Sequence, residues 1–89
     1  MRVENVEIFS DQSNLPVIRH PGRRFPGVLV QGDTLHMLCG LAAEALSDSP
    51  DARIELQELH TRLLGMLAHY KTVLNEHQVP LPFAETPDA

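Results

Sequence analysis

The sequence predicts a small α+β domain, in which a β-sheet of two or three short strands near the N-terminus packs on a C-terminal hairpin of two helices. Two observations lead to this prediction. Turn-forming residues separate short apolar runs in the first third of the chain, whereas apolar residues recur every three or four positions in two long segments after it. With 89 residues the chain has room for one domain, expected at 1–84, with a disordered tail at 85–89.

The three expected strands span residues 3–9, 15–19 and 28–31. The first alternates imperfectly, with Val6 and Ile8 on one face and Glu7 on the other, which is typical of a half-solvated strand. The polar run at 10–14 supplies the turn of a β-hairpin. Pro16 is tolerated only at the start of the second strand or on a sheet edge. The third strand is the most apolar, so we expect it to be the best covered.

Two helices are expected at residues 34–47 and 50–77. Asp33 or Thr34 can cap the first helix, and Ser49 followed by Pro50 suits the start of the second. In the second helix, apolar side chains spread over about half of the circumference. One neighbouring helix cannot cover so wide a face. The sheet therefore takes part of it, and a homodimer is the alternative to complete coverage within one chain.

Five apolar residues are the candidates for an interface with a partner. Three lie on the second helix, and two follow Pro80 in an extended segment that either folds back on the domain or contacts the partner. These candidates are Leu56, Leu63, Tyr70, Leu81 and Phe83.

Composition argues against several classes of function. The formal net charge is −5, whereas general nucleic-acid binding requires a basic surface. The single cysteine, Cys39, excludes an internal disulfide. The sequence shows neither a signal peptide nor an apolar run long enough to span a membrane, so we expect a cytoplasmic protein without membrane contact.

Basic residues are concentrated in one loop, which is the strongest candidate for a binding site. Guanidinium groups bind carboxylates and phosphates in a bidentate manner, and flanking glycines let a ligand approach closely. The candidate site for an anion or a partner consists of Arg19, His20, Arg23, Arg24 and Phe25.

Two simpler roles compete with a binding role for this loop. The arginines can instead pair with acidic residues of the same chain, of which Glu4, Glu7 and Asp11 are the nearest in sequence. The aromatic ring of Phe25 is expected to anchor the loop in the core. The sequence leaves open whether the loop binds a ligand or is only structural.

No residue pattern indicates catalysis or metal binding. His36 and Cys39 are three residues apart, but a structural zinc site usually needs four ligands. Asp33, Thr34 and His36 are residue types of a nucleophilic site, yet about 160° separates Thr34 from His36 on a helix. We therefore expect no enzymatic activity, no metal and no cofactor.

The run Arg-His-Pro-Gly-Arg-Arg-Phe-Pro-Gly-Val-Leu-Val-Gln-Gly-Asp-Thr-Leu at 19–35, with Val6, Glu7 and Ile8 upstream, resembles the signature of a family of small bacterial proteins classed as a domain of unknown function. The resemblance covers roughly residues 3–46. It implies a bacterial origin, and it transfers no functional residue.

The expected function is binding to another protein. Small size, acidity and the lack of catalytic groups suit a neutralising or accessory partner, such as an immunity protein against a bacterial toxin. One alternative is a regulator that binds an anion or nucleotide through the arginine loop at 19–24. Another is a homo-oligomeric structural protein joined through the second helix.

Overall fold

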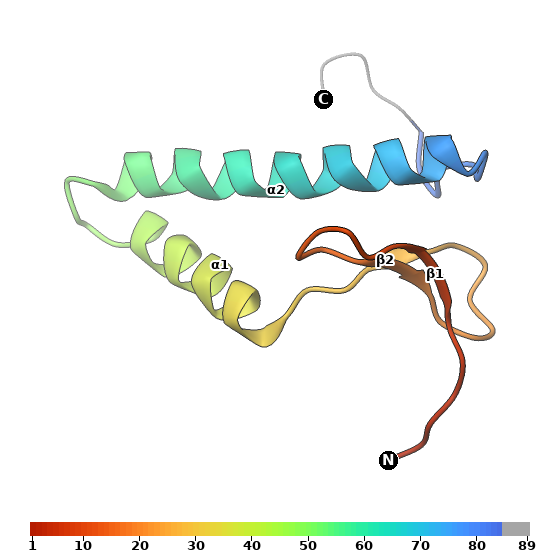
Figure 1. The fold of residues 1–89 in the computed structure, drawn as a ribbon. Coiled ribbons are helices and arrows are strands. Elements are labelled where there is room, and N and C mark those ends of the chain that lie inside the picture. Colours follow the sequence, from red (N-terminus) through yellow and green to blue (C-terminus); the bar gives the residue numbers. More distant parts are fainter. Residues whose placement is uncertain (85–89) are drawn as a thin grey trace.

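The computed structural model describes residues 1–84 and has the expected α+β fold, with a three-stranded antiparallel sheet followed by two helices (Figure 1). The strands are β1 (Glu7–Ser10), β2 (Val17–Arg19) and β3 (Gly27–Val28), and the helices are α1 (Gly32–Ala45) and α2 (Ala52–Glu76). In Figure 1 the sheet lies beneath the C-terminal half of α2, and α1 lies beneath the N-terminal half. The tail expected at 85–89 lies outside the described residues.

The sheet has the order β1-β2-β3, so the strand that is second in sequence is central. Ile8 pairs with Ile18 across β1 and β2, and Val17 pairs with Val28 across β2 and β3. The expectation that the third strand is the best covered is therefore wrong. In an antiparallel meander the middle strand has a neighbour on each side, and here it places the fully buried Val17 under α2.

All three strands are shorter than the sequence predicts. Residues 3–6 lie outside β1, and Val3 is exposed. Pro16 precedes β2, where it loses no ladder donor, and its carbonyl oxygen accepts a 2.8 Å hydrogen bond from the amide of Leu29. Leu29 itself is about half exposed and lies beyond the end of β3. The apolar residues at 28–31 therefore predicted that a strand is present, but they did not predict its length.

The core lies between the sheet and the last two turns of α2. Among the described residues, the buried apolar side chains are Val17, Tyr70, Val73 and Leu74. Half-buried residues pack around them, from the sheet and from the segment after α2. These residues are Phe9, Val28, Val79 and Leu81.

Both helices begin at different residues from those expected. α1 begins at Gly32 after an extended Gln31, and the carboxylate of Asp33 accepts a hydrogen bond from the amide of Thr34 without capping the helix. α2 begins at Ala52, because residues 49–51 form a turn in which the hydroxyl of Ser49 accepts a hydrogen bond from the amide of Asp51. Ser and Asp side chains bind nearby backbone amides in turns as well as in caps, and this ambiguity limits predictions of helix ends.

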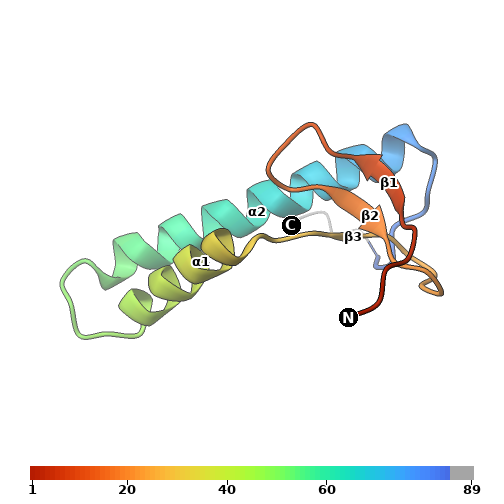
Figure 2. The same cartoon turned by 60° about the horizontal axis from the view of Figure 1, so that its bottom comes forward.

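The N-terminal part of α2 and all of α1 form a hairpin that projects from the sheet (Figure 2). No residue of α1 is buried, and the buried residues of α2 begin only at Tyr70. Most side chains of the hairpin are therefore exposed to solvent. They lie on two faces, one on each side of the plane that contains the two helices.

Candidate functional site

Arg19, the first arginine of the predicted loop site, is engaged by the chain itself. It lies in β2 opposite Glu7 of β1, and its guanidinium donates hydrogen bonds of 2.6 and 2.8 Å to the two carboxylate oxygens of Glu7. It also donates a 3.3 Å bond to the carbonyl oxygen of Arg24. The ion-pair alternative therefore holds for Arg19, which joins two strands and the following loop.

The pair also changes the ionisation of both groups. The hydrogen bonds from Arg19 hold the pKa of the Glu7 carboxyl below its ordinary value, and those to Glu7 raise the pKa of the Arg19 guanidinium. Each partner therefore favours the charged form of the other. The Glu7 side chain is exposed and the Arg19 side chain is half-buried, so solvent weakens the pair and it contributes little to the stability of the fold.

The next residues of the loop, 20–24, are exposed. Gly22 adopts a φ of 81°, and the amide of Arg23 donates a 3.1 Å hydrogen bond to the carbonyl oxygen of His20, which closes a turn. The guanidinium carbon of Arg24 lies 5.2 Å from the ring centroid of Phe25. Phe25 is half-buried and lies outside the core cluster, so the expected anchoring role is wrong.

Pro26, next to Phe25, makes the contact between this loop and the core. Its carbonyl oxygen accepts a 2.6 Å hydrogen bond from the hydroxyl of Tyr70, which is 7% exposed. Tyr70 is therefore a core residue, and its assignment as an interface candidate is wrong. Leu81 is also half-buried against the core, because the chain turns back after α2 at Gln78, whose φ is 56°. Leu56, Leu63 and Phe83 are exposed at 51, 47 and 40%.

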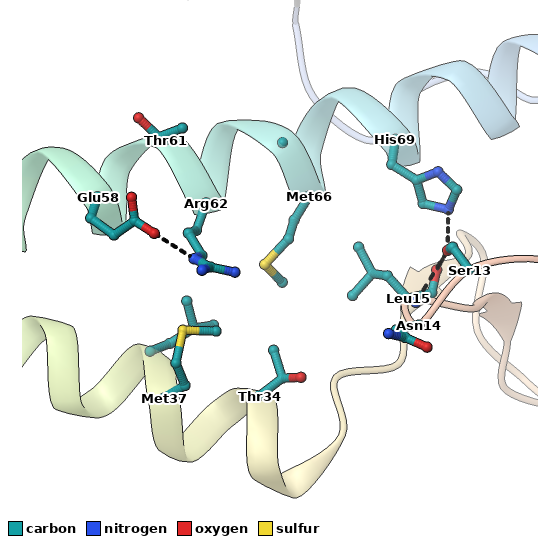
Figure 3. A pocket seen from close by; sticks show the side chains of 12 residues that line it. Ser13, Asn14, Leu15, Thr34, Met37, Glu58, Thr61, Arg62, Met66 and His69 are labelled. Carbon is teal, nitrogen blue, oxygen red and sulfur yellow. Dashed lines mark hydrogen bonds and ion pairs between the residues drawn. The ribbon is translucent and has the colours of Figure 1, made fainter.

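A groove that the sequence did not reveal lies between α1, α2 and the loop joining β1 to β2 (Figure 3). Its volume is about 620 Å³. In Figure 3 the side chains of Met37 and Met66 point toward one another from the two helices, and Leu15 extends toward them from the loop. These half-buried side chains, with Leu38, give the groove an apolar floor.

Polar groups surround this floor. The Ser13 hydroxyl and the Nε2 atom of His69 form a 3.3 Å hydrogen bond, which ties the β1–β2 loop to α2. Arg62 donates a 2.9 Å hydrogen bond to Glu58 one turn earlier on α2. A concave apolar site with a few polar groups at its rim is the usual form of a binding site. This arrangement can hold a peptide segment or a side chain of another protein.

Gly65 lies in the wall of the groove, in the middle of α2. A Cβ atom at this position would meet no other atom within 4 Å, so nothing in the folded chain requires a glycine here. Glycine in a helix interior lowers stability by roughly 0.5–1 kcal/mol relative to alanine. The groove wall is therefore open at Gly65, where a larger side chain would narrow it.

Acidic residues of the two helices gather on the groove side of the hairpin. At about 100° per residue, Glu55 and Glu58 fall within about 60° of one another on the projecting part of α2, around the direction of the groove residue Arg62. Glu58 itself lines the groove. The acidic residues of α1 also share one side of their helix, which is the side that carries Met37. They are Asp33 and Glu44.

Within residues 1–84, no three His, Cys, Asp or Glu side chains come together as ligands for a metal ion. No helix in that range combines the length and apolar character needed to cross a bilayer. The model of a family described as "Family of unknown function (DUF6959)" matches residues 1–83. No curated protein and no solved structure matches the chain.

Proposed function

The chain belongs to the family of unknown function DUF6959, and we propose that it is a protein-binding module that receives a basic segment of another protein in the groove between its helices. A neutralising or accessory role, of the kind that immunity proteins have, is the form of this proposal that the acidic composition favours.

The observation that carries the proposal is the combination of an apolar floor with acidic side chains on the same side of the hairpin. Leu15, Met37 and Met66 offer apolar contact, and methionine adapts its shape to different occupants. Glu58 lines the groove, and Asp33, Glu44 and Glu55 lie on the same side of the hairpin. A partner with an apolar side chain flanked by Lys or Arg would complement both features.

Gly65 gives this proposal a direct test. A phenylalanine at position 65 places a bulky ring at the groove wall, and its Cβ has no neighbouring atom within 4 Å outside the adjacent helix backbone. Gly40 on α1 is the matched control, because it is also a helical glycine with open space around it and lies outside the groove. Both substitutions remove the same helix-destabilising residue, so differences in binding report on the groove.

We would capture partners from a lysate of the source organism with three tagged variants, Gly65→Phe, Gly40→Phe and the double variant Arg23→Ala/Arg24→Ala, and then measure affinity with the purified partner. The proposal expects one stoichiometric partner that Gly65→Phe loses and the other two variants keep, with affinity falling as salt increases. Equal binding by all variants, or loss only in the arginine variant, would contradict it.

A further inference from the structure

The second face of the hairpin, on the side away from the acids, has an apolar seam that is mostly exposed, although Ala42 and Leu67 within it are half-buried. At about 100° per residue, one residue set on α1 and one on α2 each fall within about 60°. The set on α1 is Leu35, Cys39 and Ala42, together with Leu46 at the C-cap of the helix. The set on α2 is Leu56, His60, Leu63 and Leu67.

Both sets have the same spacing of four, three and four residues, which is the spacing of a helix-packing seam. Leu35 and Leu46 are 55 and 88% exposed, and Leu56 and Leu63 are 51 and 47% exposed. Cys39 is also exposed. The hairpin therefore exposes to solvent a row of apolar side chains of the kind that packed helices normally bury.

The two sets lie on one face. The half-buried residues that pack between the helices include Leu41 and Ala45 on α1 and Leu59 and Met66 on α2. On each helix, the seam is rotated from these residues by about 90° in the same sense. Because α1 and α2 are antiparallel (Figure 1), this rotation turns both sets to the same side of the hairpin.

Charge separates this face from the groove. The acidic residues of α1 and α2 lie about 150° around each helix from the seam. The charged helix residues nearest the seam are Arg53 and Lys71, and both lie toward the ends of the uncovered stretch. Two copies of this face could meet without bringing carboxylates together, although the chain as a whole is acidic.

Size also indicates that a surface is missing. The chain has an accessible surface of 6963 Å², whereas a compact monomer of its mass would have about 5,200 Å². The Cα radius of gyration is 15.5 Å, against about 12 Å for a compact domain of this length. The exposed residues 1–6 contribute to this excess, and the total counts all 89 residues. The excess is about twice the roughly 800 Å² that each partner gives to a standard interface.

We propose that a second copy of this chain covers the seam, so that two hairpins pack face to face as a four-helix assembly with two-fold symmetry. A surface that carries no carboxylate and is apolar on both helices except at His60 is suited to itself, and two-fold dimers are the commonest assemblies of identical chains. The proposed dimer uses the face opposite the groove. It therefore does not require that a partner protein binds in the groove.

The test is the mass of the full chain in solution, by sedimentation equilibrium from about 1 to about 200 μM. We expect a species of about 20 kDa, twice the 9.9 kDa of one chain. The double variant Leu56→Glu/Leu63→Glu should raise the dissociation constant by at least about 100-fold, because each glutamate occurs twice in a two-fold interface. Both leucines are already exposed, so the monomer should keep its fold, which circular dichroism would check.

Two controls locate the interface. The double variant Thr61→Glu/Thr72→Glu adds the same charge at exposed positions on the other side of α2 and should still form the dimer. Cys39 is the only cysteine and lies in the α1 set, so it should react with iodoacetamide at least about tenfold more slowly in the wild-type dimer than in the leucine variant. A monomer at 200 μM, a dimer unaffected by the leucine variant, or equal Cys39 reactivity in both would overturn the proposal.

Discussion

The hydroxyl of Tyr70 donates a 2.6 Å hydrogen bond to the carbonyl oxygen of Pro26, and this contact joins the C-terminal half of α2 to the residue before β3. It fixes one end of α2 on the sheet, so the opposite end projects with α1 as the hairpin. The position of the groove and of the uncovered seam both depend on this attachment.

Tyr70→Phe should lower the free energy of unfolding by about 1–3 kcal/mol, because it leaves the Pro26 carbonyl oxygen without its donor in a buried position. Urea unfolding followed by circular dichroism would measure this, at one fixed protein concentration because dimerisation adds to apparent stability. The exposed substitution Thr72→Ala is the control and should change stability by less than about 0.5 kcal/mol. A Tyr70→Phe effect as small as the control would show that the bond contributes nothing.

The ionisation of Tyr70 should depend on folding. Burial raises the pKa of its hydroxyl above the ordinary value. The chain has one tyrosine, so the absorbance change of tyrosinate reports this group alone. Its contribution to stability should be complete below the ordinary pKa of about 10 and be lost as pH rises through the raised folded value. A titration with the same midpoint in buffer and in concentrated urea would contradict the burial of the ring.

Leu74→Ala should destabilise the chain by about 2–5 kcal/mol, since Leu74 is fully buried and its removal leaves a cavity between α2 and the sheet. Ile54, which is 62% exposed on the projecting part of the same helix, provides the comparison. Ile54→Ala should cost less than about 1 kcal/mol. Equal losses at the two positions, in chemical unfolding, would place the core elsewhere.

Arg19→Ala should return the pKa of the Glu7 carboxyl toward its ordinary value, since the hydrogen bonds from Arg19 lower it. The Glu7 contribution to stability is present above the ordinary glutamate pKa of about 4.3 and is lost as pH falls through the lowered folded value. Carbon-13 NMR of the carboxyl group would follow the titration. Arg23→Ala should leave the Glu7 midpoint unchanged.

Gly65→Ala should raise the free energy of unfolding by roughly 0.5–1 kcal/mol, because the helix gains a better helix-forming residue and the added methyl group meets no other atom. The same denaturation measurement applies. A destabilised Gly65→Ala variant would mean that the fold itself requires this glycine. It would contradict the assignment of Gly65 to an open groove wall.

The sequence predicted the order and type of every element because short-range patterns determine them. Alternation, turn residues and three-four spacing indicated three strands and two helices. Strand centrality could not be predicted in this way, since the apolar run at 28–31 suggested a covered strand and the topology placed β2 in the centre. The roles of Phe25 and Tyr70 were misjudged because a contact between residues 26 and 70 leaves no local signal.

The candidate site shows the same limit. The arginine loop was visible in the sequence because its residues are adjacent, yet the pairing of Arg19 with Glu7 was only one of several options. The groove combines residues from the β1–β2 loop, α1 and α2, which only the fold brings together. Gly65 was its one available signal, as a glycine within a long apolar helical pattern.

The two faces of the hairpin should act independently, and one measurement tests this most directly. It is the ratio of captured partner to tagged chain, by quantitative mass spectrometry, for the wild type, Gly65→Phe and Leu56→Glu/Leu63→Glu. The ratio should stay close to the wild-type value in the leucine variant and fall to background in Gly65→Phe. The reverse pattern, with the partner lost from the leucine variant and kept by Gly65→Phe, would place partner binding on the apolar seam and contradict the assignment of the two faces.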